Sequence, residues 1–517
     1  MISKIFKPAT IGRATFFISA TSLVSYILGF LRDRTIATTF GASNLSDAYY
    51  SASKIPEFLV NVFIAGALAA AFLPFFSQQI TKDKQRAHEL ANTLLTVAGI
   101  TIGIVATMTF IFAPQITSIA FKDSNPETRL AIIDMIRIMA PSALLFAISN
   151  TLGNILNSYR HFYAYSLSAI FYSLGIIVGV VLLKEHIGIY SAAVGALIGA
   201  FAHLTIRILD LHHTGYKYKP AWKIRNPDFI KILKLMAPKA LSLASWQINL
   251  ILFANYGQKI IEGGTTGFDL ARNVQSAPVT LFAIAFATAT YPLLSTAAMN
   301  KDKTHFTRTL QTTIQNILFY TIPAMVGLAI LATPITYLIF AGGEFDQQAV
   351  ITTSLILTFF AFSIPLEGVS HVLSRAYYAF NNTLTPTIFN VIGMTIIAAC
   401  TIFIAPKYGI QWFSIGFTIG FLVYVTLLSI GLKNKTHNFQ YANFMTSTMK
   451  TLAASMFMAG IILLIGKLTI HIEMQPRLIT IIQVTLGGIA YFTMATLLKS
   501  PEIASLRLIT NKVFKKQ

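Results

Sequence analysis

The sequence predicts an all-α, polytopic membrane protein with about 14 transmembrane helices. Of its 517 residues, 55% are hydrophobic and only 11% are charged, whereas a soluble domain has roughly 25% charged residues. The apolar residues are gathered into runs of about 20, the length at which a helix crosses the ~30 Å hydrocarbon core of a bilayer. This composition excludes a soluble enzyme.

Fourteen apolar runs are predicted to be membrane spans, and short polar stretches separate them. They lie near residues 11–31, 48–76, 90–113, 130–157, 163–183, 187–209, 230–256, 271–298, 308–333, 348–379, 386–404, 410–432, 446–466 and 479–498. The first run is too long for a secretory signal and lacks a small-residue cleavage site before Arg32, so we expect it to be retained. Prolines inside several runs, such as Pro141 and Pro278, favour a transporter with interrupted helices over a rigid anchor.

The basic residues predict the orientation in the membrane. With the N-terminus in the cytoplasm, about 26 of the 39 Lys and Arg residues lie on that side and about 11 lie outside. An even number of spans returns the C-terminus to the cytoplasm. Because the basic residues lie between apolar runs and are not interleaved with stacking aromatic residues, the net charge of +20 indicates membrane topology and no nucleic-acid partner.

Internal repetition predicts two related halves. Three short motifs recur in the same order at offsets of 218 to 221 residues: 71–77 with 289–295, 114–117 with 334–336, and 157–160 with 378–381. We expect a six-helix lobe over 1–222, a second lobe over 223–440, and two additional helices with a basic cytoplasmic tail over 441–517. Because six is an even number, the two lobes are predicted to be parallel and to surround a central cavity.

Charged residues inside the spans are the candidate functional groups. Each costs about 2.5–3.5 kcal/mol on insertion scales, so such groups usually face a wet cavity or a partner. Lys54 and Arg272 are 218 residues apart, which is the repeat offset, so each half places one cation at an equivalent point. Two such cations facing one cavity would bind a phosphate or a carboxylate. The candidate substrate-binding residues are Arg32, Lys54 and Arg272.

Acidic residues near these cations are candidate supporting or gating groups. They are Asp33, Asp47, Glu57, Asp269 and Glu367. Asp269 precedes Arg272 by three residues, a helical spacing that fits local pairing as well as function. Glu367 lies deep in the tenth span and is either a proton or cation relay or a buried partner for a distant cation. The alternative for Arg32 and Arg34 is that they snorkel to the lipid headgroups.

No enzyme or cofactor signature is found in the sequence. The ten histidines show no metal-ligand spacing beyond the adjacent His212 and His213. There is no Walker A sequence, and the single Cys400 excludes a disulfide within one chain. We therefore expect a transporter, no catalytic residue, no metal and no cofactor, with energy supplied by an ion gradient, the membrane potential, a partner or the substrate's own gradient.

Short motifs in the first 77 residues are the most specific part of a resemblance to a known family. They are Leu-Gly-Phe-Leu-Arg-Asp at 28–33, Phe-Gly-Ala at 40–42, Ser-Asp-Ala-Tyr at 46–49, Lys-Ile-Pro at 54–56, Gly-Ala-Leu at 66–68 and Ala-Phe-Leu-Pro at 71–74. With weaker matches as far as residue 430, the chain resembles the MurJ/MviN-type lipid II flippases, whose superfamily includes multidrug exporters. It departs from many relatives at Tyr26, Val60, Asn61 and Ala65, where charged residues are common.

The resemblance implies a function in peptidoglycan biosynthesis. Such a protein moves the undecaprenyl-pyrophosphate-linked precursor lipid II from the inner to the outer leaflet of the cell membrane by alternating access. The implied partners are lipid II, membrane lipids and proteins of cell-wall synthesis. Five residues match polar positions of the family: Arg32, Asp33, Asp47, Lys54 and Arg272. The seventh and eleventh spans carry no Asp or Glu, which puts sodium coupling in doubt.

Two other functions remain open from the sequence. One is a cation-coupled multidrug exporter or a flippase for another polysaccharide-lipid, and the other is a non-transporting membrane scaffold of wall synthesis. A drug exporter would prefer an acidic or aromatic pocket, whereas Lys54 and Arg272 favour an anion. The charged face predicted for the cavity argues against a scaffold.

Overall fold

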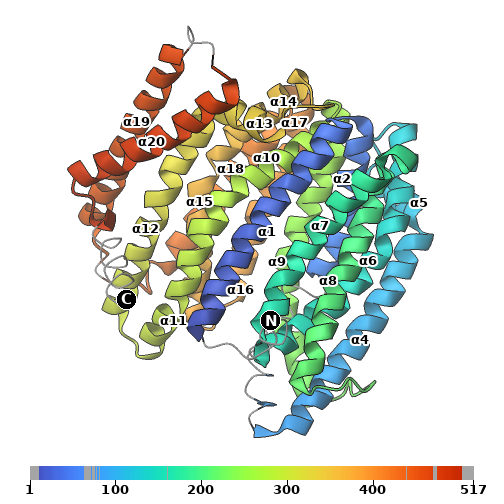
Figure 1. The fold of residues 1–517 in the computed structure, drawn as a ribbon. Helices are drawn as coiled ribbons and strands as arrows, with labels where there is room; N and C mark the ends of the chain where they lie inside the picture. Colours follow the sequence, from blue (N-terminus) through green and yellow to red (C-terminus); the bar gives the residue numbers. More distant parts are fainter. Residues whose placement is uncertain are drawn as a thin grey trace. The chain divides into compact units, whose positions relative to one another are not determined.

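The described residues form helices and no strand in the computed structural model, with one isolated β-bridge between Gly342 and Phe345 (Figure 1). The structure describes residues 11–62, 82–159, 161–437, 439–469 and 474–503, together with Phe72, Phe76, Gln79 and Ile80; for residues 11–19, 235 and 238 it describes the backbone alone. The repeat motif at 71–77, apart from Phe72 and Phe76, lies outside the described residues, as do Ala65 and the basic tail after residue 503.

The chain divides into two compact units. Unit 1 comprises Met1–Thr266 and Gly342–Asp346. Its described helices are α1 (Ile11–Phe40), α2 (Asn44–Val60), α4 (Lys84–Ile111), α5 (Ala113–Ala120), α6 (Pro126–Ser158), α7 (Phe162–Ile187), α8 (Tyr190–Leu211) and α9 (Pro227–Ile260). Because α9 falls in unit 1, the unit boundary differs from the lobe boundary expected after residue 222, and the lobes stay a prediction.

Unit 2 comprises Gly267–Ala341 and Gln347–Gln517. Its described helices are α10 (Gly264–Pro278), whose first residues belong to unit 1, the π-helix η4 (Val279–Ile284), α11 (Ala285–Met299), α12 (Lys303–Ile330), α13 (Ala332–Phe340), α14 (Gln347–Ala361), α15 (Ile364–Ala379), α16 (Leu384–Ala399), the π-helix η5 (Cys400–Ile404), α17 (Ala405–Tyr408), α18 (Gln411–Leu432), α19 (Tyr441–Thr469) and α20 (Pro476–Leu497). The prolines after α9 coincide with several of these interruptions, as at Pro278.

The helices confirm a polytopic membrane protein. Among the described residues, ten helices are long and apolar enough to cross a membrane, and the pair α14 and α15, bent by 46° at its break, makes an eleventh. The three other predicted spans correspond to α1, α2 and α9. Each of the fourteen predicted spans therefore overlaps a helix.

Several helix starts follow directly from the local sequence. Asp83 and Asp302 accept the backbone N–H three residues later, at 3.0 and 2.9 Å. Asn125 caps α6 in the same way at 2.8 Å, and a proline follows it at the first helical position. These residues satisfy N–H groups that a helix start leaves without partners.

Small residues set the helix packing in unit 1. The helices α7 and α8 lie side by side, and a Cβ added at Gly179 of α7 would lie 2.8 Å from the carbonyl oxygen of Ser191 in α8. A Cβ at Gly195 of α8 would lie 2.8 Å from the carbonyl oxygen of Gly175 in α7. Glycine stripes of this kind let two membrane helices approach closely.

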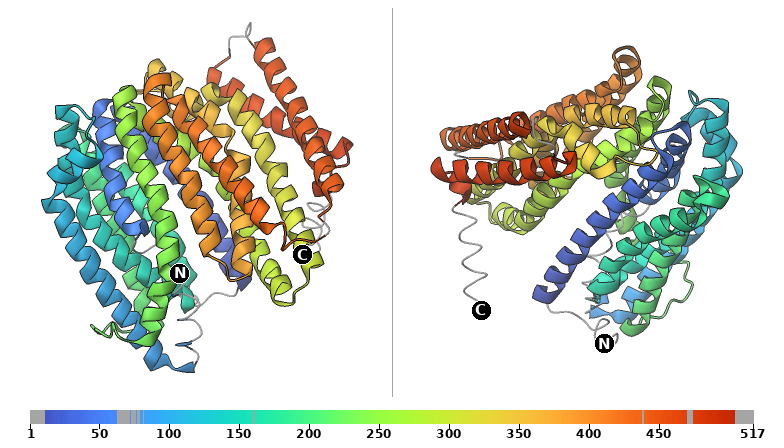
Figure 2. Two further views of the ribbon diagram at one scale, coloured as in Figure 1. Left: turned by 180° about the vertical axis from the view of Figure 1, so that it is seen from behind. Right: turned by 45° about the horizontal axis from the view of Figure 1, so that its top comes forward.

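The C-terminal helices α19 and α20 form a pair that belongs to unit 2 (Figure 2). The pair packs on α12 through a buried cluster that includes Phe319, Met458 and Tyr491. The hydroxyl of Tyr491 donates to the carbonyl oxygen of Phe319 at 2.5 Å. This bond satisfies a polar group that would otherwise be buried in apolar surroundings.

Candidate functional site

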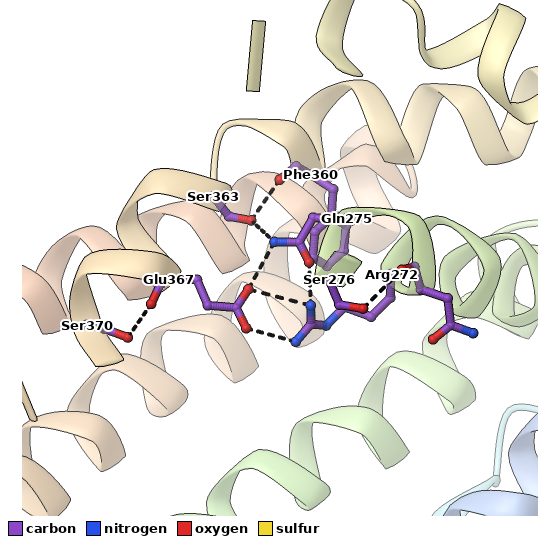
Figure 3. A network of polar contacts seen from close by, with 8 residues as sticks. Arg272, Gln275, Ser276, Phe360, Ser363, Glu367 and Ser370 are labelled. Atoms are coloured by element: carbon purple, nitrogen blue, oxygen red, sulfur yellow. Dashed lines mark hydrogen bonds and ion pairs between the residues drawn. The ribbon is translucent and has the colours of Figure 1, made fainter. Parts of the chain in front are cut away.

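An ion pair between two helices of unit 2 forms the centre of the candidate site (Figure 3). Arg272 of α10 donates from Nη2 to Oε1 of Glu367 at 3.0 Å and from Nη1 to Oε2 at 3.5 Å. The side chains are 17% and 9% exposed. Glu367 is therefore a partner of Arg272, and a relay of a proton or cation by Glu367 stays an untested alternative.

Two neutral side chains complete this network. Gln275 is fully buried and donates from Nε2 to Oε2 of Glu367 at 2.9 Å and to Oγ of Ser363 at 3.0 Å. Its Oε1 accepts a hydrogen bond from Arg272. Ser363 in turn donates to the carbonyl oxygen of Phe360 at 2.7 Å. We name Arg272, Gln275, Ser363 and Glu367 the α10–α15 network.

Two aromatic rings lie close to the guanidinium. The Cζ atom of Arg272 lies 5.3 Å from the ring centroid of Phe417 and 5.9 Å from that of Phe360. A guanidinium is more weakly hydrated than an ammonium and stacks on such faces. In this setting a charge-assisted hydrogen bond to an anion is strong, and an unpaired charge would be costly.

The α10–α15 network joins two interruptions of the helices. Glu367 lies in the first turn of α15, directly after the 46° bend that separates α15 from α14. Arg272 and Gln275 lie near the end of α10, which passes at Pro278 into the π-helix η4. π-Helical segments and broken spans are common at functional sites of membrane transporters.

The N-terminal candidates form a separate group in unit 1. Arg32 donates to Oδ1 of its neighbour Asp33 from Nε at 2.9 Å and from Nη2 at 2.6 Å. Asp33 and Lys54 are buried, whereas Glu57 is exposed. Arg32 and Asp33 thus form an ion pair within α1, and Lys54 is buried on α2.

Asp47 has a different position, at the start of α2. Its Oδ1 accepts the backbone N–H of Thr266 at 2.8 Å and the Thr266 hydroxyl at 2.7 Å. Nearby, Nδ2 of Asn44 donates to Glu262 at 3.0 Å, and these two residues are 218 positions apart, which is the repeat offset. The α1–α2 turn thus contacts the α9–α10 turn, its counterpart in the predicted repeat.

A third turn joins the same contact. The backbone N–H of Glu344, between α13 and α14, donates to the carbonyl oxygen of Thr38 at 3.0 Å. Gly41 and Gly343 have φ angles of +68° and +58°, and a Cβ at Gly41 would lie 2.6 Å from the carbonyl oxygen of Glu344. A Cβ at Gly343 would collide with the carbonyl of Thr38. We name the segments 38–47, 261–266 and 342–346 the turn layer.

The predicted residues are therefore divided between the two units. Unit 1 holds Arg32, Asp33, Asp47, Lys54 and Glu57, and unit 2 holds Asp269, Arg272 and Glu367. Asp269 is buried one turn before Arg272 on α10. The joint binding of one anion by Lys54 and Arg272 stays a prediction.

Gln275 and Ser363 were not predicted from the sequence. The available signal was their helical spacing, three residues after Arg272 and four before Glu367.

Arg207 of α8 was not predicted either; it is buried and donates to the carbonyl oxygen of Ser149 at 2.7 Å and to Oγ of Ser168 at 3.1 Å. These bonds join α8 to α6 and α7, which indicates a structural role.

The part of the chain that the structure describes offers no metal centre. Within 11–62, 82–159, 161–437, 439–469 and 474–503, no group of three or more His, Cys, Asp or Glu side chains is placed to hold a metal ion. The α10–α15 network consists of a guanidinium, its carboxylate partner and a hydrogen-bonding amide.

A family model for "Lipid II flippase MurJ" matches residues 36–482, which is most of the sequence. The chain belongs to this family. The MurJ resemblance predicted from the N-terminal motifs is therefore confirmed. Curated relatives of the MurJ family include the "Lipid II flippase MurJ" of Burkholderia cenocepacia, 23% identical over 82% of this chain and 84% of that protein. The "Probable lipid II flippase MurJ" of Thermotoga maritima is 24% identical over 96% and 98%.

Solved structures agree with the MurJ assignment. The chain is similar to a structure described as "Lipid II flippase MurJ, inward closed conformation", with a TM-score of 0.80, 26% identity, and coverage of 94% of this chain and 100% of that one. An inward-facing multidrug transporter of the MATE family has a TM-score of 0.66 at 15% identity, with 82% and 98% covered. At that identity the second likeness shows a shared fold alone.

Proposed function

We propose that the chain translocates lipid II from the inner to the outer leaflet of the cell membrane by alternating access. Membership of the MurJ family supports the substrate, and lipid II carries an anionic pyrophosphate. The single observation that carries the proposal is Arg272, a cation held at an interrupted membrane helix by a carboxylate, an amide and two aromatic rings. Such a group suits a phosphate better than a cationic drug.

Three cations contact the pyrophosphate in this proposal, namely Arg32, Lys54 and Arg272. The acidic residues have supporting roles: Asp33 orients Arg32, and Glu367 orients Arg272. Asp269 and Glu57 adjust the charge around the two cationic regions. No catalytic residue takes part, since translocation breaks no covalent bond of the lipid.

The turn layer is the outer gate in this proposal, and Asp47 is its latch. Both termini are cytoplasmic, so the α1–α2, α9–α10 and α13–α14 turns face outward. Their mutual contacts support this placement because alternate turns of a polytopic bundle share one side. Release of lipid II to the outer leaflet then requires Asp47 to leave Thr266 and Glu344 to leave Thr38.

Depletion of the protein in its own bacterium tests the substrate. We expect undecaprenyl-linked peptidoglycan precursor to accumulate at the cytoplasmic face and to disappear from the outer face, measured by enzymatic access in spheroplasts. Accumulation of a different polysaccharide-lipid would show that this lipid, and not lipid II, is the substrate. Normal precursor distribution, with wall-synthesis proteins displaced from the membrane, would instead support the scaffold function.

A further inference from the structure

We infer that Glu367 is an exchangeable counter-ion that occupies the phosphate-binding position of Arg272 until the substrate displaces it. The inference rests on the proposed function and adds a positioning residue to it. Glu367 is 95 positions from Arg272 in the sequence and reaches it from another helix, so the pair exists only in the folded protein. Its geometry, the bonds of its second partner and its place in the fold each support this role.

The pair has the geometry of a bound phosphate. The two terminal nitrogens of Arg272 face the two oxygens of one carboxylate, at 3.0 and 3.5 Å. A phosphate binds a guanidinium through the same two parallel contacts. A phosphate can therefore take up this arrangement only after the carboxylate has left it, which makes Glu367 a competitor of the substrate inside the protein.

The carboxylate of Glu367 has two stabilising features besides Arg272, a hydrogen bond from Gln275 and its position at a helix N-terminus. Oε2 of Glu367 accepts a hydrogen bond from Gln275 at 2.9 Å that does not involve Arg272. Glu367 also lies in the first turn of α15, where the partial positive charge of a helix N-terminus favours an anion. Separation from Arg272 thus leaves the carboxylate with one hydrogen bond and a favourable field, which lowers the cost of the exchange.

The exchange has a consequence for the helices. Arg272 and Gln275 on α10 are bonded to Glu367 and Ser363, which flank the bend between α14 and α15. When a phosphate takes Arg272, the bonds of Gln275 to Glu367 and Ser363 still join α10 to this bend. Substrate binding therefore loosens one of the ties between two interrupted spans, and release of the substrate restores it.

A competing internal anion also sets the affinity. Only molecules in which Arg272 is separated from Glu367 can bind the phosphate. The apparent affinity is therefore the intrinsic affinity multiplied by the fraction of such molecules. A transported lipid has to be released as well as bound, and an internal carboxylate that returns to Arg272 assists release. Loss of the carboxylate charge is then expected to strengthen binding, which a purely structural role for Glu367 does not predict.

The test is binding of farnesyl pyrophosphate to the purified full-length protein, measured by calorimetry. We expect Glu367→Gln to bind the probe about threefold to tenfold more tightly than the wild type. Arg272→Ala and the double variant Arg272→Ala/Glu367→Gln are expected to bind equally weakly, because the gain requires the guanidinium. Glu185→Gln makes the same change of net charge at an exposed residue and is expected to bind like the wild type.

Each outcome decides the inference. Unchanged or weaker binding by Glu367→Gln, including no measurable binding, overturns it, as does tighter binding that persists in the double variant. If Glu367→Gln does not fold, Glu367→Asp keeps the charge with a shorter reach and is expected to show a smaller gain, and the absence of any gain overturns the inference. Lipid II transport by the wild type is measured separately. If the wild type does not transport lipid II, the proposed function fails, but tighter probe binding by Glu367→Gln still supports the exchange.

Discussion

Arg272 and Arg32 are both neutralised by a carboxylate, but over different distances in the chain. Arg32 bonds its neighbour Asp33 on the same helix, whereas Arg272 bonds Glu367 on another helix. Breaking a buried pair by removing one partner costs about 3–5 kcal/mol, because the other charge stays buried alone. The partial exposure of Arg272 places its pair toward the lower end of that range. A substitution of Arg272 therefore changes both stability and transport, and the two effects have to be separated experimentally.

The first prediction separates them with a double variant. Arg272→Ala is expected to lower both the thermal midpoint and lipid II transport, because Glu367 loses its partner and the substrate loses its guanidinium. Adding Glu367→Gln is expected to restore most of the thermal midpoint but not transport. Thermal unfolding in detergent and complementation of a flippase-depleted strain measure the two effects. Growth restored by Arg272→Ala/Glu367→Gln would show that Arg272 has a structural role alone.

Arg272→Lys is expected to be intermediate in the same complementation assay, since an ammonium cannot form two parallel bonds to a phosphate. Lys54→Arg keeps the charge and is expected to be tolerated, and Arg34→Ala is expected to be mild. Wild-type growth of Arg272→Lys, with equal expression, would argue against a bidentate contact.

At the scale of elements, the turn layer is the part of unit 1 where backbone conformation and function meet. Gly343 has a φ of +58° and lies directly against the carbonyl of Thr38, so a side chain there is both strained and obstructed. Gly188 has a similar φ of +54°, but a Cβ added there would meet nothing within 4 Å, so a side chain at that position is strained only. The two glycines form a matched pair for testing whether the contact itself keeps the gate closed.

The second prediction uses this pair. Gly343→Ala is expected to destabilise the closed conformation of the turn layer by about 1–3 kcal/mol and to expose the first turns of α2. In a Cys400→Ala background, Ser51→Cys places a thiol of similar size at a buried position in α2. Its reaction with an impermeant thiol reagent should be faster with Gly343→Ala than with Gly188→Ala. Equal rates would show that the turn layer does not control access to α2.

The helices were largely predictable from the sequence, and the α10–α15 network was not. Spans and caps depend on neighbouring residues, as at Asn125 and α6, and each of the fourteen predicted spans overlaps a helix. The partner of Arg272 lies 95 residues away and depends on how α10 packs on α15, which no local pattern encodes. Gln275 is not predicted because a neutral amide in an apolar run carries no charge. Its spacing of three residues from Arg272 is the only local pattern that points to it.

At the scale of the whole molecule, the arrangement of the turns agrees with an even, alternating topology. In the turn layer, segments 261–266 and 342–346 each contact segment 38–47. In another part of unit 1, Arg86 at the start of α4 bonds Asp228 at the start of α9 at 2.6 Å. Turns that the topology assigns to the outer side are thus found together, and so are the helix starts that it assigns to the inner side. Which of the two sides is cytoplasmic is predicted from the basic residues.

The third prediction concerns this orientation. A cysteine at exposed Glu344, in the Cys400→Ala background, is expected to react with an impermeant thiol reagent on intact cells. A cysteine at exposed Lys301, between α11 and α12, is expected to react only after the cells are permeabilised. The reverse pattern would invert the topology and place the turn layer on the cytoplasmic side.

The most direct test of the central claim is transport of fluorescent lipid II by the purified protein in proteoliposomes, followed by its appearance in the opposite leaflet. The wild type is expected to transfer the lipid, and Arg272→Ala to reduce the rate by about tenfold or more, as expected for loss of a charge-assisted contact worth about 1.5–3 kcal/mol. Transfer by Arg272→Ala at the wild-type rate, with equal amounts of folded protein in the vesicles, would contradict the claim that this guanidinium binds the pyrophosphate.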